Sequence, residues 1–421
     1  MKNNIPDYIT KIEGHGILNI NFKEQQIQLE IQEGERLFEG VLWDQPAIRA
    51  PFITSRICGI CPTAHNLASL KAVENALGIE PDEVAINFRK LLLANQIIFS
   101  HLLHLFFFVL PDYYNVKNSF ELARRWPAEF HIVLNLKRIS DKILTLVGGR
   151  PIHPTKTTLG GFLSYPSKDE LVSLRQEIID VLDEAQDLIN IFIELEYPQI
   201  LRQTEYLCLD NENEYSFYEG NIVSSQDDKF PPEDYRDEIT EIIKPYSTAK
   251  FGQRRDKRIN VGALARISLH HQHLNIVAER YFEKIKNRGF SAKTHNPFNN
   301  NLAQSIEILH FLEESIKIID KLLDLSWPNK QEKINIQNPQ KLTWGIAAIE
   351  APRGTLYHAY EIGKNGKIIN ADILTPTVQN LTSIEKDAEE LLKMTGDKKQ
   401  AIKELEMLVR AYDPCITCSV H

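Results

Sequence analysis

Four of the five cysteines in this chain lie in two Cys-x-x-Cys motifs at opposite ends of the sequence. The first motif, RICGICPTAH, covers Arg56–His65, and the second motif, DPCITCSVH, covers Asp413–His421. Thiolates three positions apart can converge on one soft metal centre, and two pairs with matching spacing in a cysteine-poor chain predict such a site. Only folding can bring the two motifs together, so the site would also hold the last residues, which otherwise tend to fray.

The composition is that of an ordinary globular protein, with 421 residues of which 43% are hydrophobic and 25% are charged. A net charge of −9, with no basic run and no RNA-binding aromatic motif, argues against a nucleic-acid partner. The most apolar stretch, residues 97–110, is too short to span a membrane, and the first residues lack an apolar signal core. Paired thiols fit a reducing compartment, so we expect a cytoplasmic protein without a membrane span.

Hydrophobic periodicity predicts a mainly α protein with small β additions, in which a long central helix bundle accompanies an N-terminal antiparallel sheet. The metal site is expected between the two motifs. We expect one domain over residues 1–421, made of a sheet (about 1–50), a helical core with the first motif (about 51–200), an irregular strand region (about 201–262) and helices with the second motif (about 263–421).

The patterns also predict individual elements. Helices are expected after the first motif as far as Gly78, over 82–110 with an end at Pro111, over 118–147 with a bend at Pro127, from a capping box at Ser167 to about 196, and over 264–288, 302–325 and 383–412. Period-two alternation predicts a sheet over 9–42 and strands over 342–374. Residues 203–259 are expected to form short strands and loops on the outside.

Nearly the whole chain resembles the large, catalytic subunit of the nickel-iron hydrogenases. Both motifs fit the two signatures of that family at every defining position. Supporting matches follow in family order: KIEGH from Lys11, RLFE from Arg36, GGRPIHP from Gly148, VGALAR from Val261, EAPRGT from Glu350 and TPT from Thr375. The segments after Cys61 and at Leu110 are closer to the cytoplasmic, cofactor-coupled (bidirectional) group of the family.

The resemblance implies a buried nickel-iron centre, with carbonyl and cyanide ligands on iron, that splits dihydrogen heterolytically or forms it by the reverse reaction. Cys58 and Cys415 would be terminal nickel ligands, and Cys61 and Cys418 would bridge nickel and iron. Four thiolates suit soft, electron-rich metals of this kind.

The resemblance also implies roles for residues around the metals. Arg353 would lie over the open face with Pro352 beside it, accompanied by two acids, Asp112 and Asp413. Further implied residues are Glu13, which would take a proton from a terminal cysteine such as Cys415, His65, which would donate a hydrogen bond to a cysteine sulfur, and Thr377, which would donate to an iron-bound ligand.

A second metal, Mg²⁺, is implied near the C-terminus by Glu39, His421 and the backbone carbonyl near Ile373. Electrons from the first centre need a route out, but only Cys208 is left to bind anything, and it is expected to be a buried strand residue. The chain therefore cannot hold a four-cysteine iron-sulfur cluster of its own. The resemblance implies an iron-sulfur small subunit near the first motif, a flavin/iron-sulfur diaphorase module as a further candidate, and a soluble acceptor such as NAD or ferredoxin.

Other interpretations stay open at this point. The four cysteines could form a structural zinc site, although zinc motifs usually keep both pairs close in sequence. A quinone-site subunit of a respiratory complex shares the fold but generally lacks these thiolates, and a hydrogen-sensing regulatory subunit would use the same site. The remaining histidines, His101 and His104 on an apolar helix and His270, His271 and His273 on another, are expected to be structural.

Overall fold

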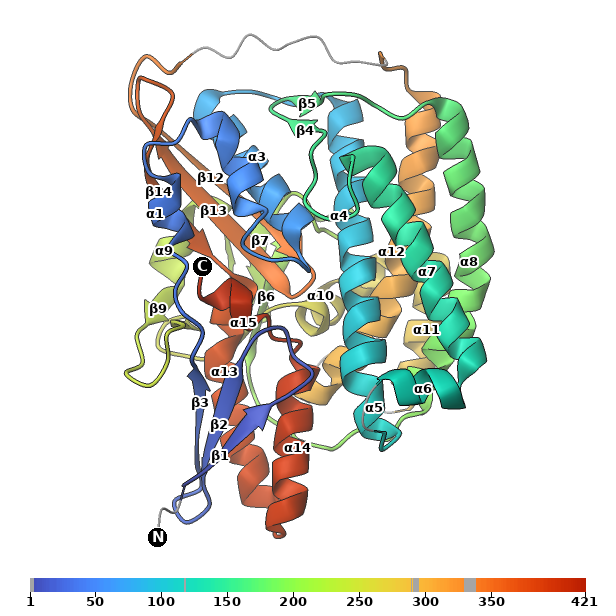
Figure 1. Cartoon of the computed structure of the whole chain (residues 1–421), viewed down its shortest axis with the longest axis vertical. Coiled ribbons are helices and arrows are strands. Elements are labelled where there is room, and N and C mark those ends of the chain that lie inside the picture. The colour runs from blue at the N-terminus through green and yellow to red at the C-terminus, as the bar shows by residue number, and fades with distance from the viewer. Residues whose placement is uncertain (1–3, 117–118, 289, 291–294, 329–337) are drawn as a thin grey trace.

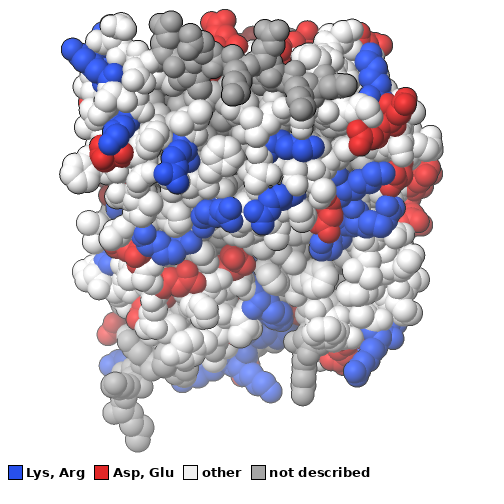
Figure 2. Space-filling model, turned by 45° about the horizontal axis from the view of Figure 1, so that its top comes forward, with Lys and Arg blue, Asp and Glu red and all other residues white. Residues whose placement is uncertain are grey.

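The computed structural model describes residues 4–116, 119–288, 290, 295–328 and 338–421. Figure 1 shows a bundle of long helices on one side, with small sheets and the two ends of the chain on the other. The predicted mainly α architecture with small sheets is therefore confirmed. Figure 2 shows one face of the molecule, where Lys and Arg side chains form a broken band across a largely uncharged surface.

The centre of the bundle is one long helix made of α4 (Glu83–Leu103), a π-helical stretch η2 (His104–Val109) and α5 (Leu110–Tyr113). It is long and apolar enough to cross a membrane, but 78% of its most apolar window is buried inside the protein, as expected of a core helix. The helix continues to Tyr113, two residues past the predicted end at Pro111. Helices α7 (Pro127–Gly148), α8 (Lys168–Glu194) and α12 (Asn300–Asp324) complete the bundle.

The two histidines of the central helix have partners in the core, as predicted. Nε2 of His101 lies 2.7 Å from the carboxylate of Glu307, and Nε2 of His104 lies 2.6 Å from the carbonyl oxygen of Arg410. Both rings are almost completely buried. They join the central helix to α12 and to the segment before the second motif.

Several predicted helices are divided in the structure. The helix over 118–147 is split into α6 (Ser119–Arg125) and α7 at Pro127, and its predicted first residue, Asn118, lies outside the described residues. The helix over 383–412 becomes α13 (Pro376–Met394) and α14 (Lys398–Ala411), the second capped by Asp397. The helix over 264–288 becomes α10 (Ala263–His270), a 3-10 turn η4 (His271–His273) and α11 (Ile276–Asn287). Both halves of the last two pairs are amphipathic, so periodicity alone does not reveal those breaks.

Two other predicted helix ends are confirmed. Helix α3 (Pro62–Leu77) follows the first motif and ends at Gly78, which has a φ of 65° that favours glycine. Helix α8 begins with the predicted capping box of Ser167 and Glu170. Local capping chemistry is therefore sufficient to place these ends.

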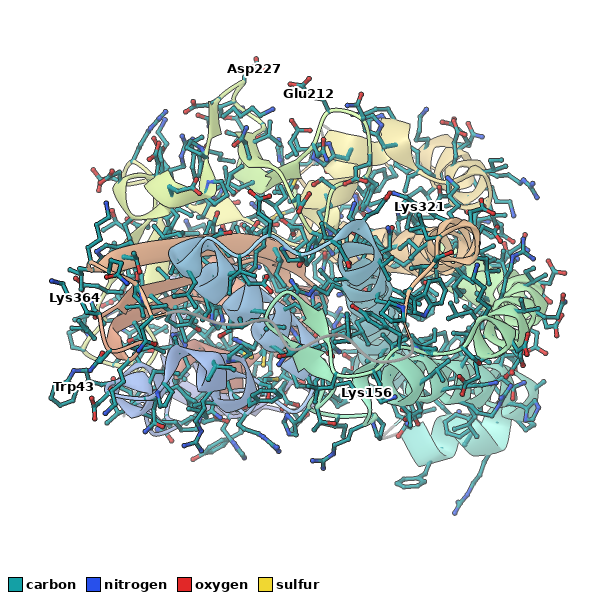
Figure 3. All side chains as sticks on the ribbon, turned by 90° about the horizontal axis from the view of Figure 1, so that it is seen from above. Trp43, Lys156, Glu212, Asp227, Lys321 and Lys364 are labelled. Carbon is teal, nitrogen blue, oxygen red and sulfur yellow. The ribbon has the colours of Figure 1, made fainter. Side chains whose placement is uncertain are left out.

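Two antiparallel sheets carry the parts of the chain that approach the two motifs. Strands β1 (Asn4–Ile9), β2 (Gly16–Asn21) and β3 (Gln26–Ile31) form the predicted N-terminal sheet, although residues 38–42 form helix α1 (Phe38–Leu42) and not a strand. Strands β12 (Thr343–Ala351), β13 (Gly354–Ile362) and β14 (Ile368–Leu374) form the second sheet. Figure 3, seen from above, shows sulfur atoms in the interior, while Trp43 and Lys364 project from the edge of the molecule.

The region expected to be irregular contains a four-stranded sheet in the order β11-β6-β7-β8 and a two-stranded pair. Its strands are β6 (Glu205–Asp210), β7 (Asn221–Ser224), β8 (Lys229–Phe230), β9 (Thr240–Ile242), β10 (Phe251–Gln253) and β11 (Ile259–Asn260). Cys208 is fully buried in β6, as predicted, together with Tyr206, Leu207 and Leu209. Much of the rest of the region is exposed, and Figure 3 shows Glu212 and Asp227 at the edge of the molecule, as expected of an external region.

The remaining short elements connect these parts. They are η1 (Ala47–Arg49), α2 (Ala50–Thr54), β4 (Thr157–Thr158), β5 (Gly161–Phe162), η3 (Pro232–Asp234), α9 (Tyr235–Glu238), η5 (Pro297–Asn299) and α15 (Ile416–Ser419). Helices α2 and α15 hold the two motifs on either side of the candidate site.

Candidate metal centre

The first motif lies in the loop between α2 and α3, directly below the surface. Cys61 immediately precedes α3, whose first residue is a proline, a favoured arrangement at a helix start. Cys58 is only 2% exposed, although its neighbours Arg56 and Gly59 are exposed. The amide of Ile60 donates a hydrogen bond to the Cys58 sulfur at 3.2 Å. Local structure therefore orients both thiols.

The second motif lies in the interior, where segments distant in sequence hold it. The amide of Ile416 donates to the carbonyl of Glu13 at 2.8 Å, beside a short parallel bridge between Glu13 and Cys415. The amide of Cys415 donates to the hydroxyl oxygen of Thr377 at 3.0 Å. The position of this motif thus depends on the N-terminal segment and on the start of α13.

Folding brings the four thiols together, as the spacing predicts. The sulfur of Cys58 lies 3.5 Å from that of Cys415, Cys61 lies 3.4 Å from Cys418, and Cys415 lies 2.9 Å from Cys418. Hydrogen bonds from the neighbouring thiols lower the pKa of Cys58, whereas burial raises the pKa of Cys415 and Cys418. A cation would stabilise all four sulfurs as thiolates, because buried negative charges need a partner.

A small cavity of about 10 Å³ adjoins the sulfurs. Its walls include Cys61, His65, Pro352, Arg353, Thr377 and Cys418. Arg353 donates through Nε to the carbonyl of Asp413 at 2.6 Å and through Nη2 to the Asp413 carboxylate at 2.8 Å. Its Nη1 is buried without a hydrogen-bond partner among the described residues. Burial opposes the charge, but Asp413 and the thiolates raise the pKa of Arg353 well above its usual value.

Asp112 has partners other than the expected arginine. Its carboxylate accepts hydrogen bonds from Lys11 and from Nε of Arg410. Among the described ion pairs, Asp413 is the acid that binds Arg353. Asp112 therefore joins the N-terminal segment to α14, one step away from the cavity.

Glu13 lies beside the second motif with its side chain partly buried. Burial, followed by the negative charge of Cys58, raises the pKa of Glu13, while Arg353 opposes this shift. A carboxyl group with a raised pKa next to a thiolate holds a proton more readily than an ordinary glutamate, which suits it to exchange protons with the site. The backbone of Glu13 pairs with that of Cys415, the terminal cysteine to which the resemblance assigns it.

Glu39, Ile373 and His421 converge at a second position next to the second motif. Nε2 of His421 lies 2.8 Å from the carbonyl oxygen of Ile373 and 3.9 Å from a carboxylate oxygen of Glu39. Nδ1 of His421 lies 2.8 Å from the carbonyl oxygen of Cys418. A neutral imidazole has a single N–H and cannot donate to both carbonyls. The arrangement therefore needs either a protonated ring or a cation among Nε2, the Ile373 carbonyl and the carboxylate.

Comparison with known proteins decides the family. The chain matches the family described as nickel-dependent hydrogenase over residues 36–129 and 201–421. The chain belongs to this hydrogenase family. It is 34% identical to sulfhydrogenase 1 subunit alpha of Pyrococcus furiosus, over 99% of this chain and 97% of that protein. It is 27% identical to the NAD-reducing hydrogenase HoxS subunit beta of Cupriavidus necator, over 99% and 94% of the two chains.

A solved structure supports the same fold. The crystal structure of an NAD⁺-reducing NiFe-hydrogenase in the H2-reduced state superimposes with a TM-score of 0.88, at 24% identity and with 99% of each chain covered. The resemblance seen in the sequence is thereby confirmed, and the chain is an oxidoreductase of the hydrogenase large-subunit type. The structural-zinc interpretation is set aside. Four soft sulfurs beneath a guanidinium whose Nη1 has no partner among the described residues fit a thiolate-bound nickel-iron group.

The hydrogenase site also contains residues that the sequence analysis did not identify. Nδ1 of His65 lies 3.1 Å from Nε2 of His358, and Nδ1 of His358 lies 2.6 Å from the hydroxyl of Tyr360, which contacts Ser69 at 2.9 Å. Burial lowers the pKa of His65 to about 3 and that of His358 well below its usual value, so both rings are neutral. Each ring then has one N–H, and this chain of hydrogen bonds determines whether His65 presents a proton to the cavity. The only feature of the sequence that could have indicated this chain of hydrogen bonds is the spacing of His358 and Tyr360, two positions apart on β13.

Proposed function

We propose that this chain is the catalytic subunit of a hydrogenase that converts dihydrogen to protons and electrons, or catalyses the reverse. Cys58 and Cys415 would be terminal ligands of nickel, and Cys61 and Cys418 would bridge nickel to iron. When bound, the nickel-iron group, with carbonyl and cyanide on iron, would supply the electron-rich metals that polarise dihydrogen. The main support is the convergence of four buried thiols from both ends of the chain beneath Arg353.

Glu13 would accept the proton that leaves the site. Its carboxyl group is close enough to Cys58 for the charge of that thiolate to raise its pKa, and its backbone pairs with Cys415. A terminal thiol that gains a proton would transfer it to this carboxylate, whose raised pKa favours holding the proton. Asp112 would act indirectly, by holding the N-terminal segment to α14 through Lys11.

Arg353, Pro352 and Thr377 would shape the open side of the metals. The free Nη1 of Arg353 can donate to an anionic ligand of iron, while Asp413 keeps the guanidinium in place. Pro352 lines the same cavity and adds no donor to it. The oxygen of Thr377 accepts from the Cys415 amide, so its own proton is available to an iron-bound ligand. His65 would donate to a cysteine sulfur when the His358 chain directs its N–H toward the cavity.

A second cation, Mg²⁺, would bind Glu39, the carbonyl of Ile373 and His421. One carboxylate oxygen, one carbonyl oxygen and one imidazole nitrogen, completed by waters, make an acceptable set for a hard cation. The two carbonyls at 2.8 Å from the His421 ring support this proposal. With a cation at Nε2, the single N–H of the neutral ring is needed only for the Cys418 carbonyl at Nδ1. The ion would attach the last residue to the β14 strand and to α1.

Electrons would leave through an iron-sulfur partner subunit on the face of the first motif. Cys58 is buried there, but Arg56 and Gly59, which lie on either side of it in the sequence, are exposed. The exposed Ile152 lies in the adjacent segment, which His153 ties to the carbonyl of Ser55 at 2.8 Å. A basic and apolar face of this kind fits a partner with acidic and apolar groups.

The partner face can be tested with Arg56→Glu and Ile152→Asp. Both changes should reduce co-purification of the iron-sulfur subunit and electron transfer to a dye. Exchange of D2 with water protons needs no electron acceptor and should persist. The control Ile276→Asp changes a side chain that is 74% exposed on α11 and should leave both measurements intact. Unchanged co-purification in the two test variants would contradict this face.

The physiological acceptor would be soluble, with NAD or ferredoxin as candidates, through a flavin/iron-sulfur diaphorase module. The relative named NAD-reducing hydrogenase HoxS supports NAD. Such coupling implies a cytoplasmic location. Reduction of NAD and of ferredoxin by the purified complex under dihydrogen distinguishes the two.

Metal analysis combined with infrared spectroscopy tests the central proposal. Equal amounts of nickel and iron, with bands from metal-bound carbonyl and cyanide, are expected from the purified holoenzyme once the iron of the partner subunit's clusters is subtracted. Formation of HD from D2 and water should accompany them. Zinc alone, without those bands and without HD, would refute a hydrogenase centre.

A further inference from the structure

Arg353 stands at the tip of the β12–β13 hairpin, so whatever fixes the tip also fixes the charge above the sulfurs. Ala351 pairs with Gly354, which leaves Pro352 and Arg353 as a two-residue turn. Gly262 has a φ of 111°, and a Cβ there would lie 2.8 Å from the carbonyl oxygen of Arg353. The tip is therefore pressed against the backbone at the start of α10.

Arg266 on α10 contacts this tip through a buried guanidinium whose five N–H groups all have acceptors. Nε and Nη2 donate to the two carboxylate oxygens of Glu307, both at 2.6 Å, and Nη1 donates to Glu350 at 2.8 Å. The other two donors reach the carbonyls of Ala351 and Pro352, each at 3.1 Å. These are the two residues immediately before Arg353. The full donor capacity of an arginine is used at one place.

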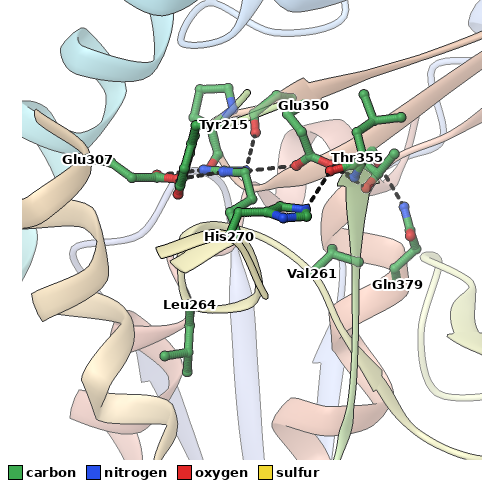
Figure 4. Close-up of polar contacts among 12 residues, drawn as sticks. Tyr215, Val261, Leu264, His270, Glu307, Glu350, Thr355 and Gln379 are labelled. Atoms are coloured by element: carbon green, nitrogen blue, oxygen red, sulfur yellow. Dashed lines mark hydrogen bonds and ion pairs between the residues drawn. The ribbon is translucent and has the colours of Figure 1, made fainter. Parts of the chain in front are cut away.

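The two carboxylates are themselves held by further donors, as Figure 4 shows. Glu307 also accepts from Tyr215 and His101 at 2.6 and 2.7 Å, and Glu350 accepts from the Leu209 amide and the Thr355 hydroxyl at 2.9 and 2.7 Å. Burial opposes the charge of Glu307, but Arg266 lowers the pKa of that carboxyl to about 2. Burial raises the pKa of Glu350. The network thus joins α4, α12, β6 and β12 around one guanidinium.

We propose that Arg266 is the positioning residue for Arg353. It fixes the carbonyls of Ala351 and Pro352 relative to the helix bundle, and thereby sets where the free Nη1 of Arg353 meets the ligands of the metal centre. A planar fork is required, because a lysine ammonium has three donors and no bidentate geometry. This inference rests on the proposed hydrogenase function, since it concerns how that same site is aligned.

The test compares Arg266→Lys with Arg89→Lys in the complete holoenzyme. Arg89 is an equally buried arginine that binds Glu74 through two hydrogen bonds at 2.6 and 2.7 Å, and none of its described hydrogen bonds reaches the hairpin tip. Arg266→Lys should retain nickel and iron, lower HD formation on the order of 10- to 100-fold, and shift the carbonyl and cyanide bands. The bands should shift in the same direction as they do in the variant Arg353→Lys. Arg89→Lys should leave the band positions unchanged.

Band positions separate positioning from general stability, because a loss of stability lowers the amount of loaded enzyme without shifting its bands. If Arg266→Lys does not fold or does not bind the metals, the same bands are measured in Glu350→Gln. It keeps the side-chain size but replaces one acceptor of Arg266, and it should also shift the bands. The test applies to whichever of the two variants contains nickel and iron. Unshifted carbonyl and cyanide bands in that variant, with HD formation within twofold of wild type, would overturn the role of Arg266. Absence of bands and HD in the wild-type enzyme would instead refute the proposed function.

Discussion

The two cysteine motifs reach the same site by different physical means. The first is held by its own helix start and by the Ile60 amide, close to the surface. The second has both cysteines buried and is held by Glu13, Thr377 and the arginine at the hairpin tip, which come from three distant parts of the chain. We infer that the first motif tolerates changes elsewhere in the fold, whereas the second responds to them.

The largest expected effect comes from removing a metal ligand, which should be equally damaging in either motif. Cys61→Ser and Cys418→Ser each remove one proposed bridging thiolate, one from each motif. Both should lose nickel and iron to less than about a tenth of the wild-type content, with no measurable HD formation, since metal affinity and site assembly are coupled. Nickel retained in Cys418→Ser alone would mean that the first motif binds the metal without the second.

Sequence patterns predicted the four cysteines, the fold class and the buried position of Cys208, because spacing and periodicity record them directly. They did not predict that Asp112 binds Lys11 and Arg410, which lie 101 and 298 positions away from it. They also missed His358 and the five acceptors of Arg266. Partners brought together by tertiary packing leave no local periodic signal, so the surroundings of the second motif were the least predictable part of the site.

Removal of the terminal imidazole should affect the second motif selectively. His421→Ala removes the contacts to the carbonyls of Cys418 and Ile373. Bound magnesium should fall from about one per chain to near zero, and activity should drop on the order of 10- to 100-fold. Hydrogen exchange should accelerate over residues 413–421 but not over residues 56–65. Equal acceleration in both motifs would contradict the proposed difference between them.

Acid should weaken the network that supports the hairpin tip. The pKa of Glu307 is about 2 in the folded protein, below the ordinary 4.5, so its contribution to stability is complete above pH 4.5 and is lost as the pH falls toward 2. The contribution is on the order of 3 kcal/mol. The difference in thermal midpoint between wild type and Glu307→Gln should therefore shrink between pH 6 and pH 3. Glu279→Gln, at an exposed position on α11, is the control and should show no such convergence. A constant difference for Glu307→Gln would mean that the carboxylate charge does not stabilise the network.

The smallest effect concerns one hydrogen bond of the second motif. Thr377→Val keeps the side-chain shape but leaves the buried amide of Cys415 without its acceptor at 3.0 Å. An unsatisfied buried amide costs about 1 to 3 kcal/mol, so the thermal midpoint should fall and hydrogen exchange at residues 413–418 should accelerate. Thr375→Val is the matched control, because its hydroxyl is buried two residues away and has no hydrogen-bond partner among the described residues.

The comparison of these two variants isolates the contact from the general cost of altering α13. If Thr377→Val accelerates exchange in the second motif and Thr375→Val does not, the motif depends on a long-range hydrogen bond that the first motif does not need. If the two variants behave alike, the contact contributes nothing specific. The second motif would then be held mainly by the metals, and its dependence on distant segments would be limited to Glu13 and to Arg353, which binds Asp413.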